Sequence, residues 1–309
     1  MDVTVCICTR DRPGYLQDCL CGLRRQTVGD AFDIVVVDSA SRRFNAAHLA
    51  RIIAGVPNAR LVRVEEPGIS LARNVGAQAA RSSYVAYIDD DAIPAPDWIE
   101  RITAAIAETD LPTALIGGRI MPRWEAPLPL WWPRQLRGTL SIIEHVGWGE
   151  YRTPALPSGL EPYGANIVVH VPTLLAMGGF GRNSGRDGRA LLSDEEVQVA
   201  WRMQDAGHSV RYDSRIVVEH QIQASRLTPA WLLSRLYWQG VSTVRTRRQL
   251  GRKHSVWREL PRRLAVAVAF APTGLLPRSS DRLLAFRWRL AYAAGFLRAA
   301  LGDALATDG

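Results

Sequence analysis

Apolar and polar positions alternate between two periods over the first 120 residues of the chain. Short apolar runs, typical of buried strands, alternate with segments whose apolar residues recur at helical spacing. The predicted strands span 3–8, 34–37, 60–64 and 84–88, and the predicted helices span 13–25, 46–54, 70–81 and 96–107. Strands joined repeatedly by helical crossovers favour an α/β fold with a doubly wound, mostly parallel sheet.

This regular pattern fails between residues 119 and 162, where Trp and Pro accumulate. Order returns with predicted strands at 164–169, 210–212 and 216–218 and predicted helices at 172–177 and 195–206. From Thr228 onward the pattern is helical, with an apolar face formed by Leu232, Leu233, Leu236, Tyr237 and Val241. We therefore expect one domain over 1–225, with halves of about 1–118 and 119–225, and a helical extension over 226–309.

The formal net charge of +8 is distributed unevenly along the chain. Residues 1–225 contain 23 Arg against 26 acidic residues, a net of −3, whereas residues 226–309 contain 15 basic against 4 acidic residues, a net of +11. Amphipathic helices that combine Arg with Trp fit an anionic membrane interface, and they fit equally a helical cap on the preceding domain. Because no nucleic-acid recognition motif accompanies this charge, we expect no nucleic-acid partner.

Targeting and cysteine patterns are unremarkable. Met1 and Asp2 run directly into an apolar segment without a basic region or cleavage site, so we expect no signal peptide. The longest apolar candidate, 264–270, is far shorter than the roughly 18 residues that a spanning helix needs. We therefore expect the cytoplasm, with peripheral membrane contact through 255–302 as an alternative. The four cysteines have no zinc-site spacing and are expected to be buried thiols.

Three adjacent carboxylates, Asp89, Asp90 and Asp91, follow directly after the predicted strand 84–88. They repel one another and are costly near a sheet edge without a cation. Ligands of doubly wound sheets bind beyond the carboxyl ends of the strands, and Mg²⁺ and Mn²⁺ prefer carboxylate and phosphate oxygens. The triplet therefore predicts a divalent-metal site, with a solvated acidic turn as the alternative.

The glycine-rich phosphate loops of two common nucleotide-binding folds are missing from the sequence. No G-x-G-x-x-G follows the first strand, and no G-x-x-x-x-G-K-[ST] occurs anywhere. The diphosphate of a bound nucleotide would then have to be held through a metal ion, which agrees with the aspartate triplet.

Eight short motifs occur in the order found in inverting family 2 glycosyltransferases of the GT-A fold. They are Cys8-Thr-Arg-Asp-Arg-Pro13, Val37-Asp-Ser39, Gly68-Ile-Ser-Leu-Ala-Arg-Asn74, Tyr87-Ile-Asp-Asp-Asp91, Tyr163-Gly-Ala-Asn166, Gly178-Gly-Phe180, Ser193-Asp-Glu-Glu196 and Val218-Glu-His220. Over roughly residues 3–250 the chain resembles a bacterial-type member of that family. The resemblance implies a GT-A fold, a nucleotide-sugar donor, and Mn²⁺ or Mg²⁺.

The resemblance also implies roles for individual residues on the donor side. The nucleotide would be bound by Thr9, Arg10, Asp38, Arg73, Asn74, Asp89 and Asp90. A carboxylate at Asp38 can accept the imide N–H of uracil or thymine, which favours a UDP- or dTDP-sugar; a turn or helix cap is the alternative. The metal would be held by Asp91, Asp89 and His220, with Asp91 the better candidate for direct contact.

On the acceptor side, the resemblance implies a catalytic base at the start of the helix 195–206. The family has Glu-Asp where this chain has Glu195-Glu196. The register counted back from Ala206 and Gly207 places Glu196 at the position of the aspartate in that pair. Acidic residues that stabilise a helix N-terminus are the alternative. The sugars would contact Gly164, Ala165, Asn166, Asp194, Trp131 and Trp132, although the two tryptophans fit loop packing equally well.

Together these features predict a metal-dependent inverting glycosyltransferase that acts on a glycan, lipid-linked or small-molecule acceptor. A sugar-nucleotide pyrophosphorylase is the first alternative, but it should carry a glycine-rich loop and a lysine near the first strand, and Lys253 is the only lysine. A non-catalytic sugar- or membrane-binding protein on a transferase fold is the second. The intact triplet and Glu195-Glu196 argue against it.

Overall fold

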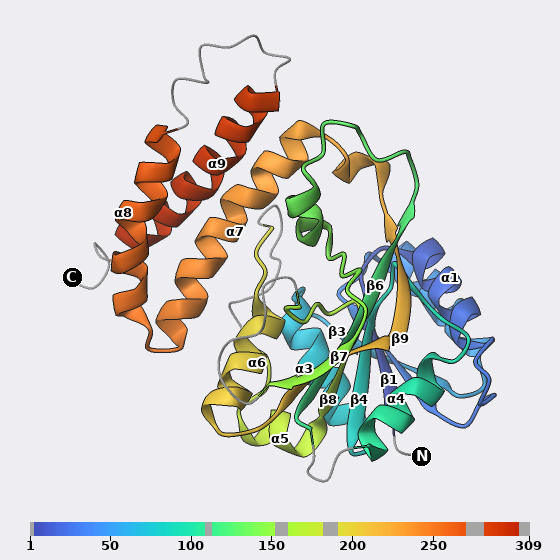
Figure 1. The fold of residues 1–309 in the computed structure, drawn as a ribbon. Helices are drawn as coiled ribbons and strands as arrows, with labels where there is room; N and C mark the ends of the chain where they lie inside the picture. The colour runs from blue at the N-terminus through green and yellow to red at the C-terminus, as the bar shows by residue number, and fades with distance from the viewer. Residues whose placement is uncertain (1–2, 109–112, 152–159, 182–190, 270–280, 303–309) are drawn as a thin grey trace. The chain divides into compact units, whose positions relative to one another are not determined.

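The computed structural model describes residues 3–108, 113–151, 160–181, 191–269 and 281–302 (Figure 1). The chain forms two compact units. Unit 1 comprises Met1–Arg123, Leu140–Asn183 and Glu196–Ile222, and unit 2 comprises Trp124–Thr139, Ser184–Glu195 and Gln223–Gly309. The division at Ile222 lies beside the boundary expected near residue 225, and two earlier segments group with the C-terminal helices.

The first four strands of unit 1 form the parallel part of its sheet, in the order β3-β2-β1-β4. They are β1 (Val3–Thr9), β2 (Asp33–Ser39), β3 (Ala59–Val64) and β4 (Tyr84–Asp89). Thr9 is paired with Asp38 and Cys8 with Asp89, so the carboxyl ends of the central strands lie together. The α/β class predicted from the strand–helix alternation is confirmed.

Helices cover both faces of this sheet, because successive residues of each buried strand point to opposite sides. Val5 and Ile7 pack with α1, α2 and α4, whereas Cys6 and Cys8 pack with α3, α5 and α6. The helices are α1 (Pro13–Leu23), α2 (Arg43–Ala54), α3 (Ile69–Ala79), α4 (Trp98–Ala107), α5 (Val171–Ala176) and α6 (Glu195–Asp205). Three cysteines are buried as expected, but Cys21 is exposed, which corrects the prediction for that residue.

The remaining strands pair largely antiparallel and were only partly predicted. They are β5 (Ala92–Pro94), β6 (Leu115–Trp124), β7 (Trp148–Tyr151), β8 (Ile167–His170) and β9 (Val210–Ile222). β8 pairs antiparallel with β4 and β6, and β9 with β5 and β7. The strands expected at 210–212 and 216–218 are one continuous strand. The irregular segment expected after residue 119 includes the end of β6 and all of β7.

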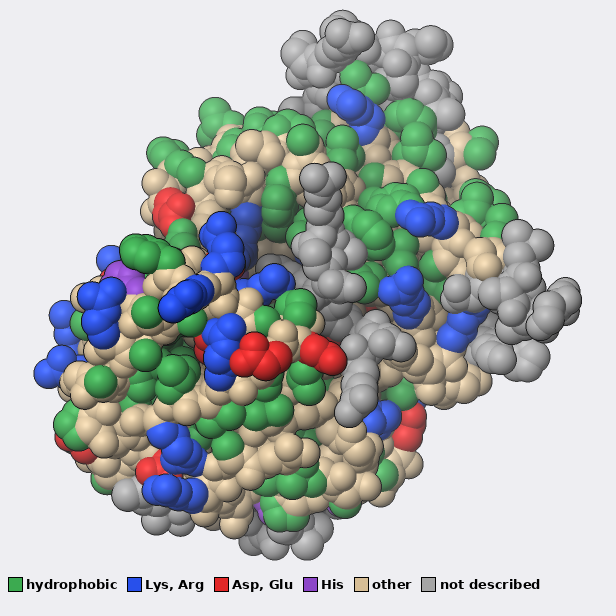
Figure 2. Space-filling view, turned by 180° about the vertical axis from the view of Figure 1, so that it is seen from behind, with side chains coloured by type: hydrophobic (Ala, Val, Ile, Leu, Met, Phe, Trp, Pro, Cys, Tyr) green, Lys and Arg blue, Asp and Glu red, His purple; other side chains and the backbone are tan. Residues whose placement is uncertain are grey.

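Unit 2 is built around three helices, α7 (Pro229–Gln249), α8 (Lys253–Ala269) and α9 (Asp281–Gly302), with the short helices η1 (Arg134–Leu140) and η2 (Ala224–Arg226). Gly240 and Gly295 bring α7 and α9 into backbone contact, since a Cβ on Gly295 would lie 1.9 Å from the Tyr237 carbonyl oxygen. On the face of the molecule that Figure 2 shows, hydrophobic side chains occur among basic ones. In the described part of the chain, no helix has both the length and the apolarity needed to span a bilayer.

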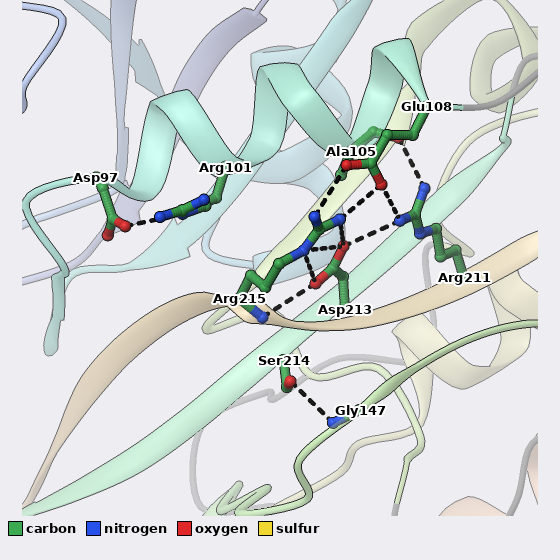
Figure 3. Close-up of polar contacts among 9 residues, drawn as sticks. All are labelled: Asp97, Arg101, Ala105, Glu108, Gly147, Arg211, Asp213, Ser214 and Arg215. Carbon is green, nitrogen blue, oxygen red and sulfur yellow. Dashed lines mark hydrogen bonds and ion pairs between the residues drawn. The ribbon is translucent and has the colours of Figure 1, made fainter.

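Four charged residues of unit 1, which we call the strand cluster, join the end of α4 to β9 (Figure 3). Asp213, with a side chain that is 0% exposed, accepts hydrogen bonds from Arg211 and Arg215 at 3.1 and 2.7 Å. Both guanidinium groups also contact Glu108, at 2.7 and 2.6 Å. Two carboxylates and two guanidinium groups thus balance one another without any external ion.

Candidate active site

The aspartate triplet lies at the carboxyl end of β4, beside the end of β1. Thr9 Oγ1 donates a 2.7 Å hydrogen bond to Asp90 Oδ2, and Arg12 Nη1 contacts Asp90 Oδ1 at 3.2 Å and Asp91 Oδ2 at 3.1 Å. Asp90 and Asp91 are buried, whereas the side chain of Asp89 is 35% exposed. Burial, followed by repulsion from Asp91, raises the pKa of Asp90 to about 7. The triplet therefore carries more negative charge than its surroundings compensate.

His220 lies on β9, which pairs antiparallel with β5 directly after the triplet. Its Nε2 lies 3.3 Å from Asp91 Oδ1, and its Nδ1 lies 3.1 Å from the carbonyl oxygen of Leu140. A carbonyl oxygen can only accept, so Nδ1 carries the proton and donates it. In the neutral ring Nε2 then presents a lone pair to a carboxylate oxygen, which is stable only with a proton or a cation between them. A backbone carbonyl that fixes the second nitrogen is also the usual arrangement of a metal-binding histidine.

Arg73, on α3, connects the triplet to the start of α6. Its side chain is 4% exposed, and its guanidinium contacts Asp89 Oδ1 at 3.5 Å and Glu196 Oε1 at 2.8 Å. The guanidinium carbon also lies 5.5 Å from the ring centre of Phe180, and Tyr87 donates a hydrogen bond to the Arg73 carbonyl. One buried cation therefore links the donor-side carboxylates to the candidate base.

Glu196 has a well-defined orientation. Both of its hydrogen-bond donors, Arg73 and the backbone N–H of Gly164 (2.8 Å), contact Oε1. Among the described residues Oε2 has no such donor, and it is left to accept a proton. The absence of a side chain at Gly164 is required here, because a Cβ would lie 1.7 Å from Arg73 Nη2 and 2.5 Å from Glu196 Oε1.

The neighbouring acidic residues belong to unit 2. Glu195 is buried, and Asp194 has a backbone φ of +76°. Asp194 Oδ1 accepts hydrogen bonds from Gln239 Nε2 at 2.7 Å and from Ser193 Oγ at 3.1 Å. Helix α7 thus holds the segment that immediately precedes α6. The choice between Glu195 and Glu196 as the base remains a proposal, favoured by the geometry of Glu196.

The residues expected around the nucleobase have different environments. Arg10 is exposed, whereas Asp38 is 1% exposed and accepts hydrogen bonds from Arg63 (2.5 Å) and from the backbone N–H of Ser41 (3.0 Å). A nucleobase that reached the Asp38 carboxylate would have to displace Arg63, whose side chain is 36% exposed. Arg63 was not expected in this region, because nothing in its sequence context indicates a partner 25 residues away.

Two asparagines expected to contact the donor have their amides occupied by the protein. Asn74 pairs through both amide atoms with the backbone of Phe180. Asn166 accepts from Trp98 Nε1 and donates to the carbonyl oxygens of Arg119 and Ile216. These contacts are structural and stabilise the loop at Phe180 and the junction of the sheet. The side-chain amide of Asn166 is thus engaged within the protein, and its predicted sugar contact stays a prediction.

The other expected acceptor residues are distributed between the two units. Gly164 and Ala165 are buried in unit 1. Trp131 and Trp132 lie in unit 2, where the buried Trp132 ring is 5.3 Å from that of Trp131 and 6.4 Å from that of Trp231. The burial of Trp132 supports the packing alternative for that residue, and the predicted sugar contact of the two tryptophans stays a prediction. Arg12 belongs to the first motif, and the sequence assigned it no role. Its position shortly after the end of β1 is the signal that could have indicated its contact with the triplet.

Comparison with known proteins shows which proteins the chain is similar to. Residues 4–149 match the family model "Glycosyl transferase family 2". A glucosyl-dolichyl phosphate glucuronosyltransferase of Haloferax volcanii is 29% identical over 246 residues, which cover 78% of this chain and 76% of that protein. A pre-mycofactocin glycosyltransferase of Mycobacterium tuberculosis is 26% identical over 227 residues, covering 71% of this chain but only 42% of the relative.

Solved structures show the same fold. The mannosyltransferase PcManGT from Pyrobaculum calidifontis, in complex with GDP-Man and Mn²⁺, superposes with a TM-score of 0.57 at 19% identity and covers 98% of this chain and 75% of its own. Staphylococcus aureus TarS 1-349, in complex with UDP, gives 0.56 at 14% identity, covering 99% and 92%. The fold is GT-A, as predicted. Residues 4–149 thus match glycosyl transferase family 2, and the chain is a glycosyltransferase.

Proposed function

We propose that the chain is a metal-dependent inverting glycosyltransferase that uses a UDP- or dTDP-sugar. The observation that carries this proposal is the pair Asp91 and His220, whose facing oxygen and nitrogen atoms lie 3.3 Å apart. The described residues contain no group of three or more His, Cys, Asp and Glu side chains able to hold a metal. The protein would therefore supply a carboxylate and an imidazole, a donor set that suits Mn²⁺, and the donor diphosphate would complete the coordination.

A metal held by Asp91 and His220 would act as a Lewis acid that neutralises charge on the departing nucleoside diphosphate. The protein supplies the other half of the reaction. As the acceptor oxygen bonds to the anomeric carbon and the bond to the diphosphate oxygen breaks, Glu196 Oε2 takes the acceptor proton. Arg73 and Gly164 hold Oε1 during this transfer. Attack from the face opposite the leaving group inverts the configuration.

The nucleobase of the sugar donor and the identity of the acceptor rest on other observations. The structural neighbours bind GDP-Man and UDP, so they do not distinguish between nucleobases, and the preference for uridine or thymidine rests on Asp38. The name of one relative specifies a dolichyl-phosphate sugar and that of another a pre-mycofactocin. A lipid-linked acceptor, with peripheral membrane contact through 255–302, and a small-molecule or glycan acceptor therefore all belong to the proposal.

The test is a panel of sugar nucleotides, each assayed with Mn²⁺ and with Mg²⁺ for thermal stabilisation and for nucleoside diphosphate release. Asp91→Ala should abolish metal-dependent stabilisation by the donor. Glu196→Gln should keep that stabilisation and lose transfer by about 10²–10⁴-fold, the usual contribution of a general base. Glu195→Gln is the matched control for Glu196. Donor stabilisation without any divalent ion, or full turnover by Glu196→Gln, would contradict the proposal.

A further inference from the structure

The outer face of α8 is an exposed apolar surface within the basic tail. Trp257, Leu264 and Val268 are 47%, 41% and 69% exposed, and they follow one another at spacings of seven and four residues. Residues at these spacings lie on one side of a helix. Pro261, also exposed, fills the gap in this row. The described structure thus leaves a continuous apolar row of about three turns in water.

The last part of α8 is apolar on every side. Residues 264–269 read Leu-Ala-Val-Ala-Val-Ala, and Val266, on the side opposite Leu264, is 37% exposed. Six helical residues at about 1.5 Å each extend over about 9 Å. An interfacial helix lies in the plane of the membrane, with its apolar face about 5–10 Å deep at the boundary between headgroups and acyl chains.

Basic residues accompany the apolar row, and the one acidic residue of α8 is used elsewhere. Arg258 and Arg262 are exposed and lie one step round the helix from Trp257 and Pro261. Glu259 is the only acidic residue between 253 and 269, and it accepts hydrogen bonds from Arg247 and Arg263. Arg263 also stacks on Tyr292 of α9, at 4.8 Å from the ring centre. The negative charge of α8 is therefore directed toward α7 and α9, and its outer face is cationic.

We propose that the outer face of α8 binds an anionic lipid bilayer, with Leu264–Ala269 entering the interface and Arg258 and Arg262 contacting lipid phosphates. Charge complementarity selects this occupant. A second copy docked face to face through the same row would bring two sets of arginines together without a carboxylate on either face. Binding to a membrane surface needs no partner residue from the protein. It rests on the peripheral contact included in the proposed function, but it does not depend on the transfer reaction.

The test uses the full chain, without nucleotide, and vesicles of phosphatidylcholine with or without phosphatidylglycerol. We expect co-sedimentation with the anionic vesicles, weakened by high salt because screening shortens the reach of the arginines. Leu264→Ser with Val268→Ser should lower the partition coefficient at least about tenfold. Arg258→Ser with Arg262→Ser should lower it about 30-fold for anionic vesicles only, since each basic residue near the surface contributes about fivefold.

Phe44→Ser is the matched control, because Phe44 is 78% exposed on α2 in unit 1, and it should bind vesicles like the wild type. All substituted positions are exposed, and circular dichroism verifies that each variant is folded. Absence of wild-type vesicle binding would overturn the inference, as would equal binding by the Leu264 and Val268 double variant. A wild-type dimer that this double variant abolishes would show that a second copy covers the face instead. Nucleoside diphosphate release, measured separately, reports on the proposed function alone.

Discussion

Two charged clusters in unit 1 use the same residue types in opposite ways. The strand cluster, Glu108, Arg211, Asp213 and Arg215, pairs each carboxylate with guanidinium groups of the same unit. At the triplet, Arg12 contacts Asp90 and Asp91. Arg73 contacts Asp89 and is also bound to Glu196. The strand cluster is complete within the protein, whereas the triplet leaves negative charge for something that binds.

The pKa shifts express the same difference. Hydrogen bonds from Arg215 and Arg211 lower the pKa of Glu108 to about 2, so the fold favours its charged form. Burial and the neighbouring Asp91 raise the pKa of Asp90 to about 7, so the fold disfavours its charged form. A structural cluster gains stability from its charges, and a binding cluster gives up stability that a ligand can restore. This contrast separates the two by physics rather than by motif.

Removal of a carboxylate from the strand cluster should have the largest effect on stability. In Asp213→Ala, the buried guanidinium of Arg211 loses its most buried partner. Loss of one member of a buried ion pair costs about 3–5 kcal/mol, and we expect the free energy of unfolding to fall by that amount in urea titrations. Asp97→Ala, which removes an exposed pair with Arg101, is the control and should change little. A loss below about 1 kcal/mol for Asp213→Ala would show that the cluster is not structural.

The connection from the triplet to Glu196 can be disturbed without removal of a charge. Gly164→Ala places a Cβ against Arg73 and Glu196 and should displace the carboxylate. Misplacement by about 1 Å can cost about 10²-fold in rate, so we expect kcat to fall by that factor while the donor still stabilises the protein. Gly14→Ala, where a Cβ would meet no atom within 4 Å, is the control. Wild-type kcat in Gly164→Ala would show that the position of Glu196 is not critical.

Neutralisation of a carboxylate in the triplet should raise the free energy of unfolding, whereas removal of one from the strand cluster should lower it. With a folded pKa of about 7 against an ordinary value near 4, native Asp90 binds more protons than the unfolded chain between these pH values. The free energy of unfolding therefore falls as pH rises through this window, and the full penalty applies above it. Asp90→Asn should remove that dependence and raise the free energy of unfolding at pH 8 by about 1–2 kcal/mol, after the loss of the Arg12 contact is deducted.

Chelator-treated protein, unfolded in urea at pH 5 and at pH 8, provides this measurement. The variant should gain stability at pH 8 and little at pH 5, where the wild-type carboxyl is already protonated in the fold. If Asp90→Asn is less stable than the wild type at pH 8, the Asp90 carboxylate is a structural group, and the contrast with the strand cluster fails.

Much of the fold and part of the site could be predicted from the sequence, because both depend on local patterns. Buried parallel strands form continuous apolar runs, and the triplet lies directly after one of them. The short antiparallel strands β5 and β7 lack such runs, and Pro94 and Trp148 within them resemble loop residues. Only pairing with β9 makes them strands.

Contacts between distant segments could not be predicted. Asn166 belongs to a motif that suggested a sugar contact, yet its amide donates to the carbonyl oxygens of Arg119 and Ile216 and accepts from Trp98. The single oxygen of Glu196 held by both Arg73 and Gly164 depends on three segments that meet only in the folded chain. Motif order indicates which residues approach the site, and tertiary structure determines which of their atoms remain available.

The smallest expected effect is that of neutralising Glu108, the exposed carboxylate of the strand cluster. It tests the contrast between the two clusters at acidic pH. Because the folded pKa of Glu108 lies below its ordinary value, its contribution is present above about pH 4.5 and is lost as pH falls toward 2. Glu108→Gln should therefore flatten the decline of the melting temperature between pH 5 and pH 3, most clearly at low salt, since its side chain is 42% exposed. Asp90→Asn should instead steepen that limb between pH 5 and pH 4, because native Asp90 keeps a proton there that the unfolded chain releases, and this difference offsets part of the wild-type decline. A flattened acid limb in Asp90→Asn would mean that Asp90 is ionised in the native state at these pH values, and the two clusters would then not differ in kind.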